Sequence, residues 1–174
     1  MPSTYTLITG ETLASAVASY TFSAIPSTFT DLVVRYSMRK SDTNNGPINV
    51  LVRFNGSAAA NYSQTTMLGI YTTPISSRES NETRFLTYAV GGGSTLNTFS
   101  NNEIYIPNYA GSANKVASNF DSAENKSSTD FQWGVGARAY LRSVTAAITS
   151  ITFDGNGDNL VSGSSFYLYG IKKS

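Results

Sequence analysis

The segment Asp154-Gly155-Asn156-Gly157-Asp158 is the strongest candidate for chemistry in this chain of 174 residues. Its alternating oxygen-bearing side chains could wrap a hard cation such as Ca²⁺. An EF-hand loop, however, needs Gly at its sixth position and Glu at its twelfth, where this chain has Asn159 and Ser165. Asn-Gly and Asp-Gly pairs are also the ordinary residues of a hairpin turn. We therefore predict a turn at residues 154–158 and assign no metal ligand.

Other catalytic arrangements are poorly supported by the residues present. Ser-His-Asp catalysis is excluded because the chain contains no histidine. Ser112 and Lys115 have Ser-x-x-Lys spacing, but they lie in a turn-rich segment and not on the helix that this chemistry needs. A glycosidase needs a pair of carboxylates, and no spacing marks such a pair among the scattered acids, of which Asp31, Glu103 and Asp130 lie near strand ends or on polar faces. We assign no catalytic residue and no cofactor, and we expect that the protein is not an enzyme.

The composition favours one all-β domain with a polar but weakly charged surface. Apolar residues make up 40% of the chain and charged residues only 13%, against a usual charged share of about 25%. Ser, Thr and Asn fill the difference, and strand faces tolerate such residues better than helix surfaces do. A length of 174 residues fits a single domain, over residues 1–174, that can bury a real core.

The charge balance constrains the partners. Twelve basic and eleven acidic residues give a net charge of +1, which argues against nucleic acid, because that partner needs clustered Lys and Arg. A low net charge also reduces repulsion between copies of the protein. The chain has no cysteine, so disulfides and thiolate chemistry are excluded. We see no secretory signal and no apolar stretch of 18 residues, and we expect a protein made in a cytoplasm with no membrane partner.

Polar and apolar residues alternate in about ten short segments, which predicts an antiparallel β-sandwich. Residues 103–106 show the pattern, and Pro107 ends it because proline lacks the N–H that a strand partner needs. No helical pattern interrupts the strands. A jelly-roll-like sandwich is the first choice of topology, and another Greek-key sandwich is the second. We expect strands at residues 5–8, 19–23, 31–40, 48–55, 62–70, 84–90, 99–106, 115–120, 131–140, 148–153 and 165–171.

The two clearest strands, residues 31–40 and 48–55, flank a seven-residue loop, and their simplest pairing is an antiparallel hairpin. This pairing would place Arg35, Arg39 and Arg53 on one outer face. We expect Trp133 and the alternate residues from Ile48 to Phe54 to be buried. Loops are expected at residues 72–82, at the flexible glycine run 91–94 and at residues 121–130.

Several motifs resemble small virion proteins of tailed bacteriophages. They are Glu103-Ile-Tyr-Ile-Pro-Asn-Tyr-Ala-Gly-Ser112 followed by Lys115, Ala146-Ala-Ile-Thr-Ser-Ile151 and Phe166-Tyr-Leu-Tyr-Gly-Ile171, with Arg53-Phe-Asn-Gly56 and Asn61-Tyr-Ser63 fitting the same pattern. The likeness runs from about Tyr5 to Ile171. Proteins of this kind are similar to capsid decoration (cement) proteins and to head- or tail-fibre modules. The resemblance implies a β-sandwich that binds the outside of a head shell, and it carries over no site residue.

The resemblance leads to an expected function and an alternative. The expected function is that of a structural virion protein on the outer capsid surface, with the major capsid protein and further copies of itself, as a homotrimer, for partners. The alternative is a receptor- or glycan-binding module of a fibre that uses Tyr, Asn and Asp in its loops. The chain has no collagen-like or coiled-coil shaft, and this favours decoration over a fibre. A carbohydrate-active enzyme on a jelly roll is the weakest hypothesis.

Overall fold

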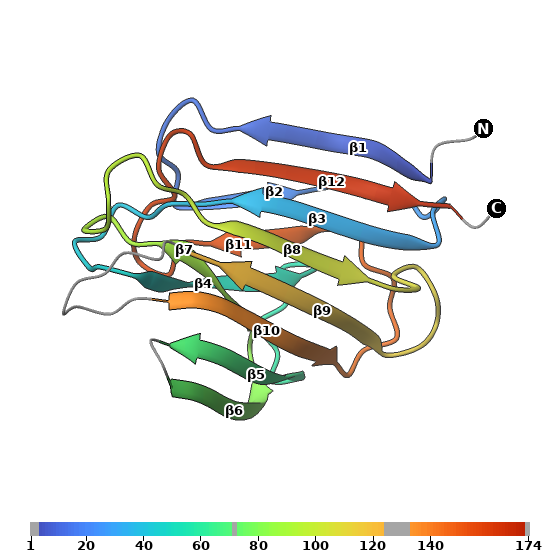
Figure 1. The fold of residues 1–174 in the computed structure, drawn as a ribbon. Helices are drawn as coiled ribbons and strands as arrows, with labels where there is room; N and C mark the ends of the chain where they lie inside the picture. Colours follow the sequence, from blue (N-terminus) through green and yellow to red (C-terminus); the bar gives the residue numbers. More distant parts are fainter. Residues whose placement is uncertain (1–3, 71–72, 124–132, 173–174) are drawn as a thin grey trace.

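The computed structural model describes residues 4–70, 73–123 and 133–172, which form two antiparallel sheets and no helix (Figure 1). The large sheet contains, in spatial order, β1 (Tyr5–Thr12), β12 (Ser165–Ile171), β3 (Asp31–Ser37), β8 (Asn101–Ile106), β9 (Lys115–Ser122), β10 (Trp133–Arg142), β5 (Tyr62–Ile70) and β6 (Thr73–Glu82). The small sheet contains, in the same way, β2 (Ser19–Phe22), β11 (Ile151–Asp154), β4 (Pro47–Phe54) and β7 (Phe85–Val90). The predicted all-β sandwich is confirmed.

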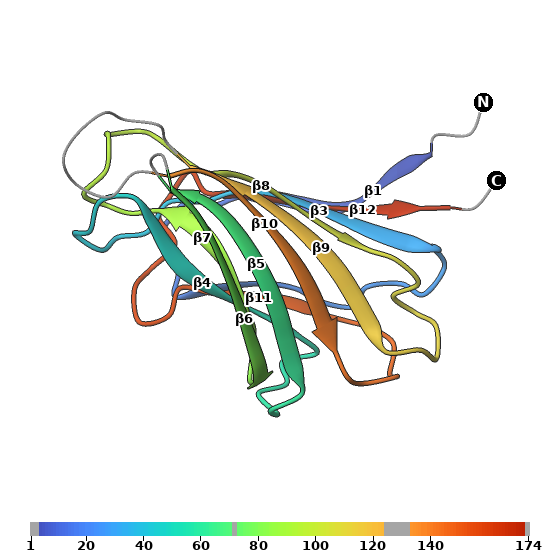
Figure 2. The ribbon, with the colours of Figure 1, turned by 60° about the horizontal axis from the view of Figure 1, so that its bottom comes forward.

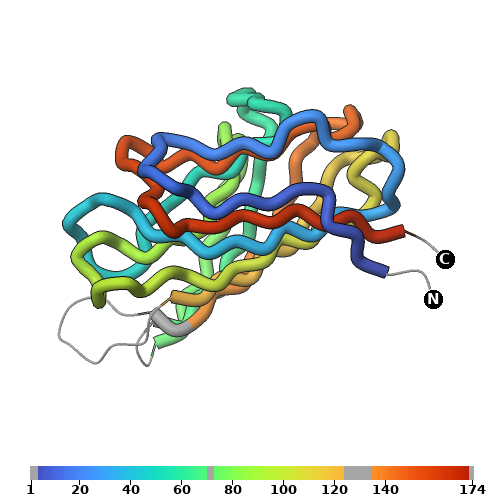
Figure 3. Tube along the Cα trace, turned by 90° about the horizontal axis from the view of Figure 1, so that it is seen from above, coloured from blue at the N-terminus to red at the C-terminus, as the bar shows by residue number. Residues whose placement is uncertain are grey.

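Eight of the strands have jelly-roll topology. Strands β1, β12, β3 and β8 are neighbours in the large sheet, and β2, β11, β4 and β7 are neighbours in the small one. The chain therefore changes sheet at every step from β1 to β2, from β2 to β3 and from β3 to β4. Its first strand pairs with its last, as two interlocked Greek keys require. The start of β1 and the end of β12 consequently lie side by side (Figure 3).

The remaining four strands extend the large sheet beyond the jelly roll. The β5–β6 hairpin is inserted between β4 and β7, and β9 and β10 are inserted between β8 and β11. Together they continue the sheet from β8 in the order β9, β10, β5 and β6, and Figure 2 shows them as a curved continuation of the same layer. We call these four strands the extension.

The apolar core lies between the two sheets of the jelly roll. On β4 the predicted face is confirmed, since Val50, Val52 and Phe54 are fully buried and Ile48 is half-buried. The side chain of Trp133, also predicted to be buried, lies outside the part of the chain that the structure describes. The β3 strand and the residue after it contribute four further buried side chains, which also alternate as predicted: Leu32, Val34, Tyr36 and Met38.

The predicted hairpin of β3 and β4 is wrong. The β3 strand pairs with β12 and β8, whereas β4 pairs with β11 and β7 in the other sheet. Alternation of polar and apolar residues shows which face of a strand is buried. It does not show whether two strands joined by a short loop pair with each other or lie in opposite sheets, as they do in a jelly roll. The three arginines therefore do not share a face: Arg35 pairs with Glu103, Arg53 pairs with Asp154, and Arg39 is buried.

A strand replaces the predicted loop at residues 72–82. Residues Thr73–Glu82 form β6, the outermost strand of the large sheet, and most of its side chains are exposed. Polar residues occupy both faces, so there is no alternation to read, and Pro74 near its start is tolerated because the strand lies at an edge. Of the other predicted loop, Asp121 and Ser122 belong to β9, and residues 124–130 lie outside the described part.

The glycine run 91–93 is tightly packed, not a free loop tip. A Cβ atom on Gly91 would lie 2.3 Å from the Asn44 carbonyl oxygen, and one on Gly92 would lie 1.9 Å from that of Asp42. Glycine is needed here because two backbone segments come into contact. The buried guanidinium of Arg39 fixes the same loop by donating to four carbonyl oxygens, those of Gly92, Ser94, Thr95 and Thr98.

Candidate binding surface

The Asp154–Asp158 segment forms the predicted turn. The φ angles of Asn156 and Gly157 are 55° and 93°, and the Asp158 N–H donates to the Gly155 carbonyl oxygen at 3.3 Å. Positive φ at both central residues is the geometry for which Asn-Gly is favoured. The Asp154 carboxylate accepts a hydrogen bond from the Asn156 N–H at 2.8 Å, which braces the turn from within.

Both carboxylates of this segment are paired with cations of the protein itself. Asp154 lies 2.9 Å from the Arg53 guanidinium, and Asp158 lies 3.1 Å from the ammonium of Lys40, whose side chain is only 1% exposed. Nowhere in residues 4–70, 73–123 and 133–172 do three acidic side chains gather as metal ligands would. The turn therefore serves to neutralise Arg53 and a buried lysine.

The Ser112-x-x-Lys115 spacing has a structural role. The Lys115 ammonium donates to the carbonyl oxygens of Gly111, Ala113 and Thr145, the last two at 2.6 and 3.1 Å. Burial, with a smaller contribution from the nearby Arg142, lowers the pKa of Lys115. These contacts use all three N–H donors of the ammonium, so Lys115 holds two loops together and has no donor left for Ser112.

The candidate acids are likewise occupied. Asp31 accepts hydrogen bonds from the Tyr105 hydroxyl at 2.8 Å and from the Asn108 N–H at 2.9 Å. Glu103 lies 2.9 Å from Arg35. Asp130 lies outside the described residues. Asp31 and Glu103 thus brace the surface of the large sheet.

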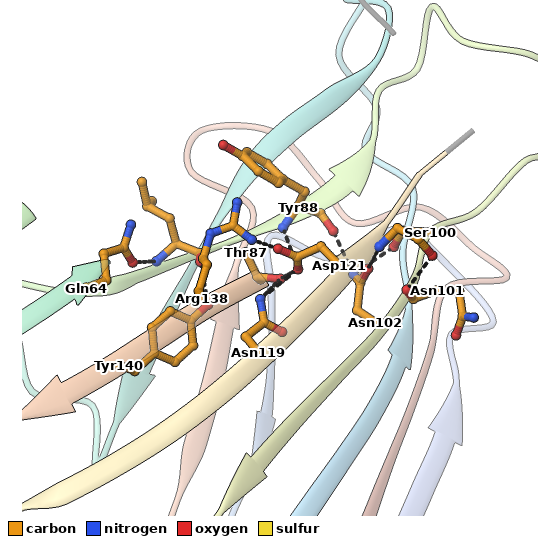
Figure 4. A network of polar contacts seen from close by, with 12 residues as sticks. Gln64, Thr87, Tyr88, Ser100, Asn101, Asn102, Asn119, Asp121, Arg138 and Tyr140 are labelled. Atoms are coloured by element: carbon orange, nitrogen blue, oxygen red, sulfur yellow. Dashed lines mark hydrogen bonds and ion pairs between the residues drawn. The ribbon is translucent and has the colours of Figure 1, made fainter. Parts of the chain in front are cut away.

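The inner face of the extension carries a buried polar network that sequence analysis did not identify (Figure 4). Asp121 on β9 forms an ion pair with Arg138 on β10, and their side chains are only 3% and 1% exposed. The Thr87 hydroxyl donates to Asp121 at 2.5 Å, and the Asn119 amide donates to it at 2.7 Å. The guanidinium of Arg138 also lies over the Tyr88 ring, 4.1 Å from its centroid.

This network supplies the hydrogen bonds that β7 lacks as the edge strand of the small sheet. The Leu86 N–H donates to the Gln64 side chain at 2.8 Å, and the Leu86 carbonyl accepts from the Tyr140 hydroxyl at 2.5 Å. The Tyr88 carbonyl accepts from the Asn102 amide at 2.7 Å. Side chains of β5, β8 and β10 therefore take the place of a neighbouring strand, which explains polar residues in the interior.

Two buried tyrosines join this network to the jelly roll. The Tyr36 hydroxyl lies 2.7 Å from that of Thr87 and donates to Asn119 at 2.9 Å. Burial raises the pKa of Tyr36 well above its ordinary value, and burial also raises that of Tyr140. Both rings therefore remain neutral hydrogen-bonding groups, and the network gives the extension a rigid attachment.

The outer face of the extension has the opposite character. Its large apolar side chains are open to solvent, with Met67 66% exposed, Phe120 54% and Val135 42%, and Ser118 and Thr65 lie beside them. Two hollows of about 410 and 490 Å³ lie on this face, and Met67, Phe120 and Ala137 line both of them. We call the outer-face residues Met67, Phe120, Val135, Ala137 and Ala139 the apolar half.

The outer face of the jelly roll, on the same sheet, carries tyrosines and paired charges. The rings of Tyr5 and Tyr169 meet edge to face with centroids 6.5 Å apart, and the Arg35 guanidinium lies 5.8 Å from each centroid. Arg35 also pairs with Glu103, next to the exposed ring of Tyr105. We call the outer-face residues Tyr5, Arg35, Glu103, Tyr105, Tyr167 and Tyr169 the tyrosine half.

The comparisons with known proteins identify no family. No protein-family model matches the chain, and no curated protein matches its sequence. The described residues include no helix that is long and apolar enough to cross a bilayer.

Proposed function

We propose that this chain is a non-enzymatic structural protein of a tailed-bacteriophage virion, which decorates the outer surface of the head shell and stabilises it. The phage assignment comes from the sequence resemblance. What supports a role within an assembly is the outer face of the large sheet, where the extension exposes the apolar half beside the jelly roll. Soluble proteins that act alone rarely expose contiguous apolar patches of this kind.

The tyrosine half is the surface that we propose for contact with the shell. Tyr and Arg are enriched at protein–protein interfaces because they combine apolar area with directed polar groups. Here Arg35, Tyr5 and Tyr169 are already held together by ring contacts and by the ion pair to Glu103. Such a preorganised surface loses little conformational entropy on binding. A shell bound in this way gains an interface that must break before its subunits can separate.

The test is to mix the purified protein with undecorated phage heads and count the bound copies after sedimentation. Decoration predicts saturable, stoichiometric binding and heads that resist heating better. The double variant Arg35→Ala with Tyr169→Ala should reduce binding at least about 30-fold, as loss of central interface residues does. Leu96→Ala is the matched control, because Leu96 is 81% exposed in the loop between β7 and β8 and is not one of the tyrosine-half residues.

A second candidate function is glycan binding, and the tyrosine half also favours it. Exposed Tyr rings beside Arg35, Glu103 and Asp31 combine flat apolar area with hydrogen-bonding groups, as a sugar requires. Binding to host cells that a surface glycan competes for, together with no binding to bare heads, would replace the decoration proposal with this one.

A further inference from the structure

We propose that the apolar half binds the apolar half of a second copy of this chain, giving a twofold-symmetric dimer in which the two large sheets stack face to face. The inference goes beyond decoration, since it concerns the free protein and stands whether or not the dimer binds a head. It rests on the order of side chains across the sheet, on the charges at the two rims and on the size of the face.

The order of side chains across the sheet is self-complementary. Hydrogen-bonded register places Glu103 of β8, Phe120 of β9, Ala137 of β10, Met67 of β5 and Ser76 of β6 in one row. A small residue thus lies at the centre, with a large apolar one on each side. A twofold axis that runs parallel to β10 between the two faces places Phe120 of one copy against Met67 of the other. Each large side chain then lies beside a hollow lined by Ala137.

The side chains at the two rims of the face are also complementary under this axis. The next row contains Tyr105 of β8 at one rim and Arg78 of β6 at the other, with Ser118, Ala139 and Thr65 between them. The axis brings exposed Arg78 of one copy over Tyr105 of the other, one row from Glu103. The arrangement permits a cation–π contact of Arg78 with the Tyr105 ring on each side of the dimer, next to the Arg35–Glu103 ion pair.

The size of the face suits a stable dimer. The five strands from β8 to β6 are six to ten residues long. With strands about 4.8 Å apart and a rise of about 3.4 Å per residue, they cover roughly 24 by 29 Å in projection. That projection is about 700 Å², and side-chain relief brings the accessible area toward the about 800 Å² per partner of a standard interface.

The charge pattern favours a second copy over other occupants. A membrane or nucleic-acid partner would require clustered basic residues, and the face has a single cation, Arg78, at one rim and the Arg35–Glu103 ion pair at the other. The net charge of +1 also leaves little repulsion between copies. The pattern supports a pair about a twofold axis in place of the expected homotrimer, because in a closed ring each copy would have to offer a second, different complementary surface.

The first experiment measures the mass of the full-length protein by sedimentation velocity over a range of concentrations. We expect a monomer–dimer equilibrium. Phe120→Asp should weaken the dimer at least about 30-fold, as expected for a central interface residue, while leaving the fold intact because the side chain faces solvent in the monomer. Leu96→Asp, which adds the same charge to an exposed loop residue, should leave the dimer unchanged.

The second experiment tests the axis with cysteines, of which the chain has none of its own. Stacked sheets lie about 10 Å apart, too far for a disulfide, so a short bis-maleimide is the reagent. A mixture of Phe120→Cys and Met67→Cys proteins should cross-link strongly between the two variants. Phe120→Cys alone, and Leu96→Cys mixed with either variant, should cross-link weakly.

Four results would overturn the proposal. They are a monomer at every concentration, a trimer, a dimer that Phe120→Asp does not weaken, and equal cross-linking of Phe120→Cys with itself. If cysteines in the apolar half were protected from the maleimide only when heads are added, this face would bind the shell protein and not a second copy. Failure to bind heads would leave the dimer result standing, so the two proposals fail separately.

Discussion

The jelly-roll half and the extension half of the large sheet have opposite polarity, although one sheet contains both. On the face turned toward the small sheet, residues that pair across neighbouring strands form rows. One such row changes from apolar residues in the jelly roll to polar residues in the extension: Leu168, Val34 and Ile104, then Asn119 and Arg138. The corresponding outer row changes from charged to apolar side chains at the same boundary, between β8 and β9: Tyr167, Arg35 and Glu103, then Phe120, Ala137 and Met67.

This contrast arises because the polarity of a strand face depends on what covers it. The inner face of the jelly-roll half packs on the flat face of the small sheet, which offers side chains such as Val52 and Phe153. The inner face of the extension meets the edge of β7, which offers backbone N–H and C=O groups of Leu86 and Tyr88. Apolar residues there would leave these groups buried without partners.

The first prediction places a charge in the jelly-roll core. Val52→Asp should abolish folding, because Val52 is fully buried among apolar side chains and an unpaired charge there costs more than about 5 kcal/mol, comparable to the whole stability of a domain. Loss of the cooperative thermal transition in circular dichroism would confirm this.

The control for this prediction makes the same substitution on the exposed side of the extension. Val116 on β9 is 47% exposed, so at concentrations where the protein is monomeric Val116→Asp should change the free energy of unfolding by less than about 0.5 kcal/mol. A folded Val52→Asp protein, or an unfolded Val116→Asp protein, would contradict the assignment of inner and outer faces.

The second prediction concerns the buried ion pair of the extension. Asp121→Ala should lower the free energy of unfolding by about 3–5 kcal/mol, because Arg138 is left buried without its counter-charge. Adding Arg138→Met to that variant should recover part of the loss. Chemical denaturation of the single and double variants measures both effects.

An exposed ion pair of the jelly-roll half provides the comparison. Arg35 and Glu103 have side chains that are 57% and 44% exposed, so Glu103→Ala should cost less than about 1 kcal/mol. Equal losses for Asp121→Ala and Glu103→Ala would remove the distinction between the two halves.

Sequence reasoning predicted the jelly-roll half better than the extension. Alternation identifies a buried face wherever apolar residues point inward, as at Val34 on β3 and Val52 on β4. On β9 the alternation of Phe120 with Asn119 and Asp121 is equally clear, but only the position of the β7 edge shows that the polar set is the buried one. Strand β6 lacks alternation altogether. No local pattern carries information about a distant strand edge.

The third prediction uses pH to test the tyrosines that join the two halves. Burial raises the pKa of Tyr36 and Tyr140 in the folded protein, so their contribution to stability is complete below the unfolded value of 10.0 and is lost as pH rises above it. The free energy of unfolding should therefore fall above pH 10, by up to about 1.4 kcal/mol per pH unit for each tyrosine.

A matched variant separates this effect from other titrations. The lowered pKa of Lys115 acts in the opposite sense, raising stability as pH increases toward the unfolded value of 10.5. Tyr36→Phe should be less stable than the wild type at pH 8. The difference between their free energies of unfolding should narrow above pH 10, because only the wild type has the Tyr36 hydroxyl to ionise on unfolding. A difference in free energy of unfolding that stays constant with pH would show that unfolding does not change the ionisation of Tyr36.

A weak effect is expected at the Asp154 turn, which follows β11 in the small sheet of the jelly roll. Its ion pair with Arg53 is only partly buried, at 36% and 21% exposure, so Asp154→Asn should cost less than about 1 kcal/mol, far less than Asp121→Ala. Because Arg53 and Lys40 already neutralise the two carboxylates, EDTA should leave the melting temperature unchanged. A melting temperature that falls with EDTA and recovers with Ca²⁺ would show that the turn binds a cation in spite of these pairs.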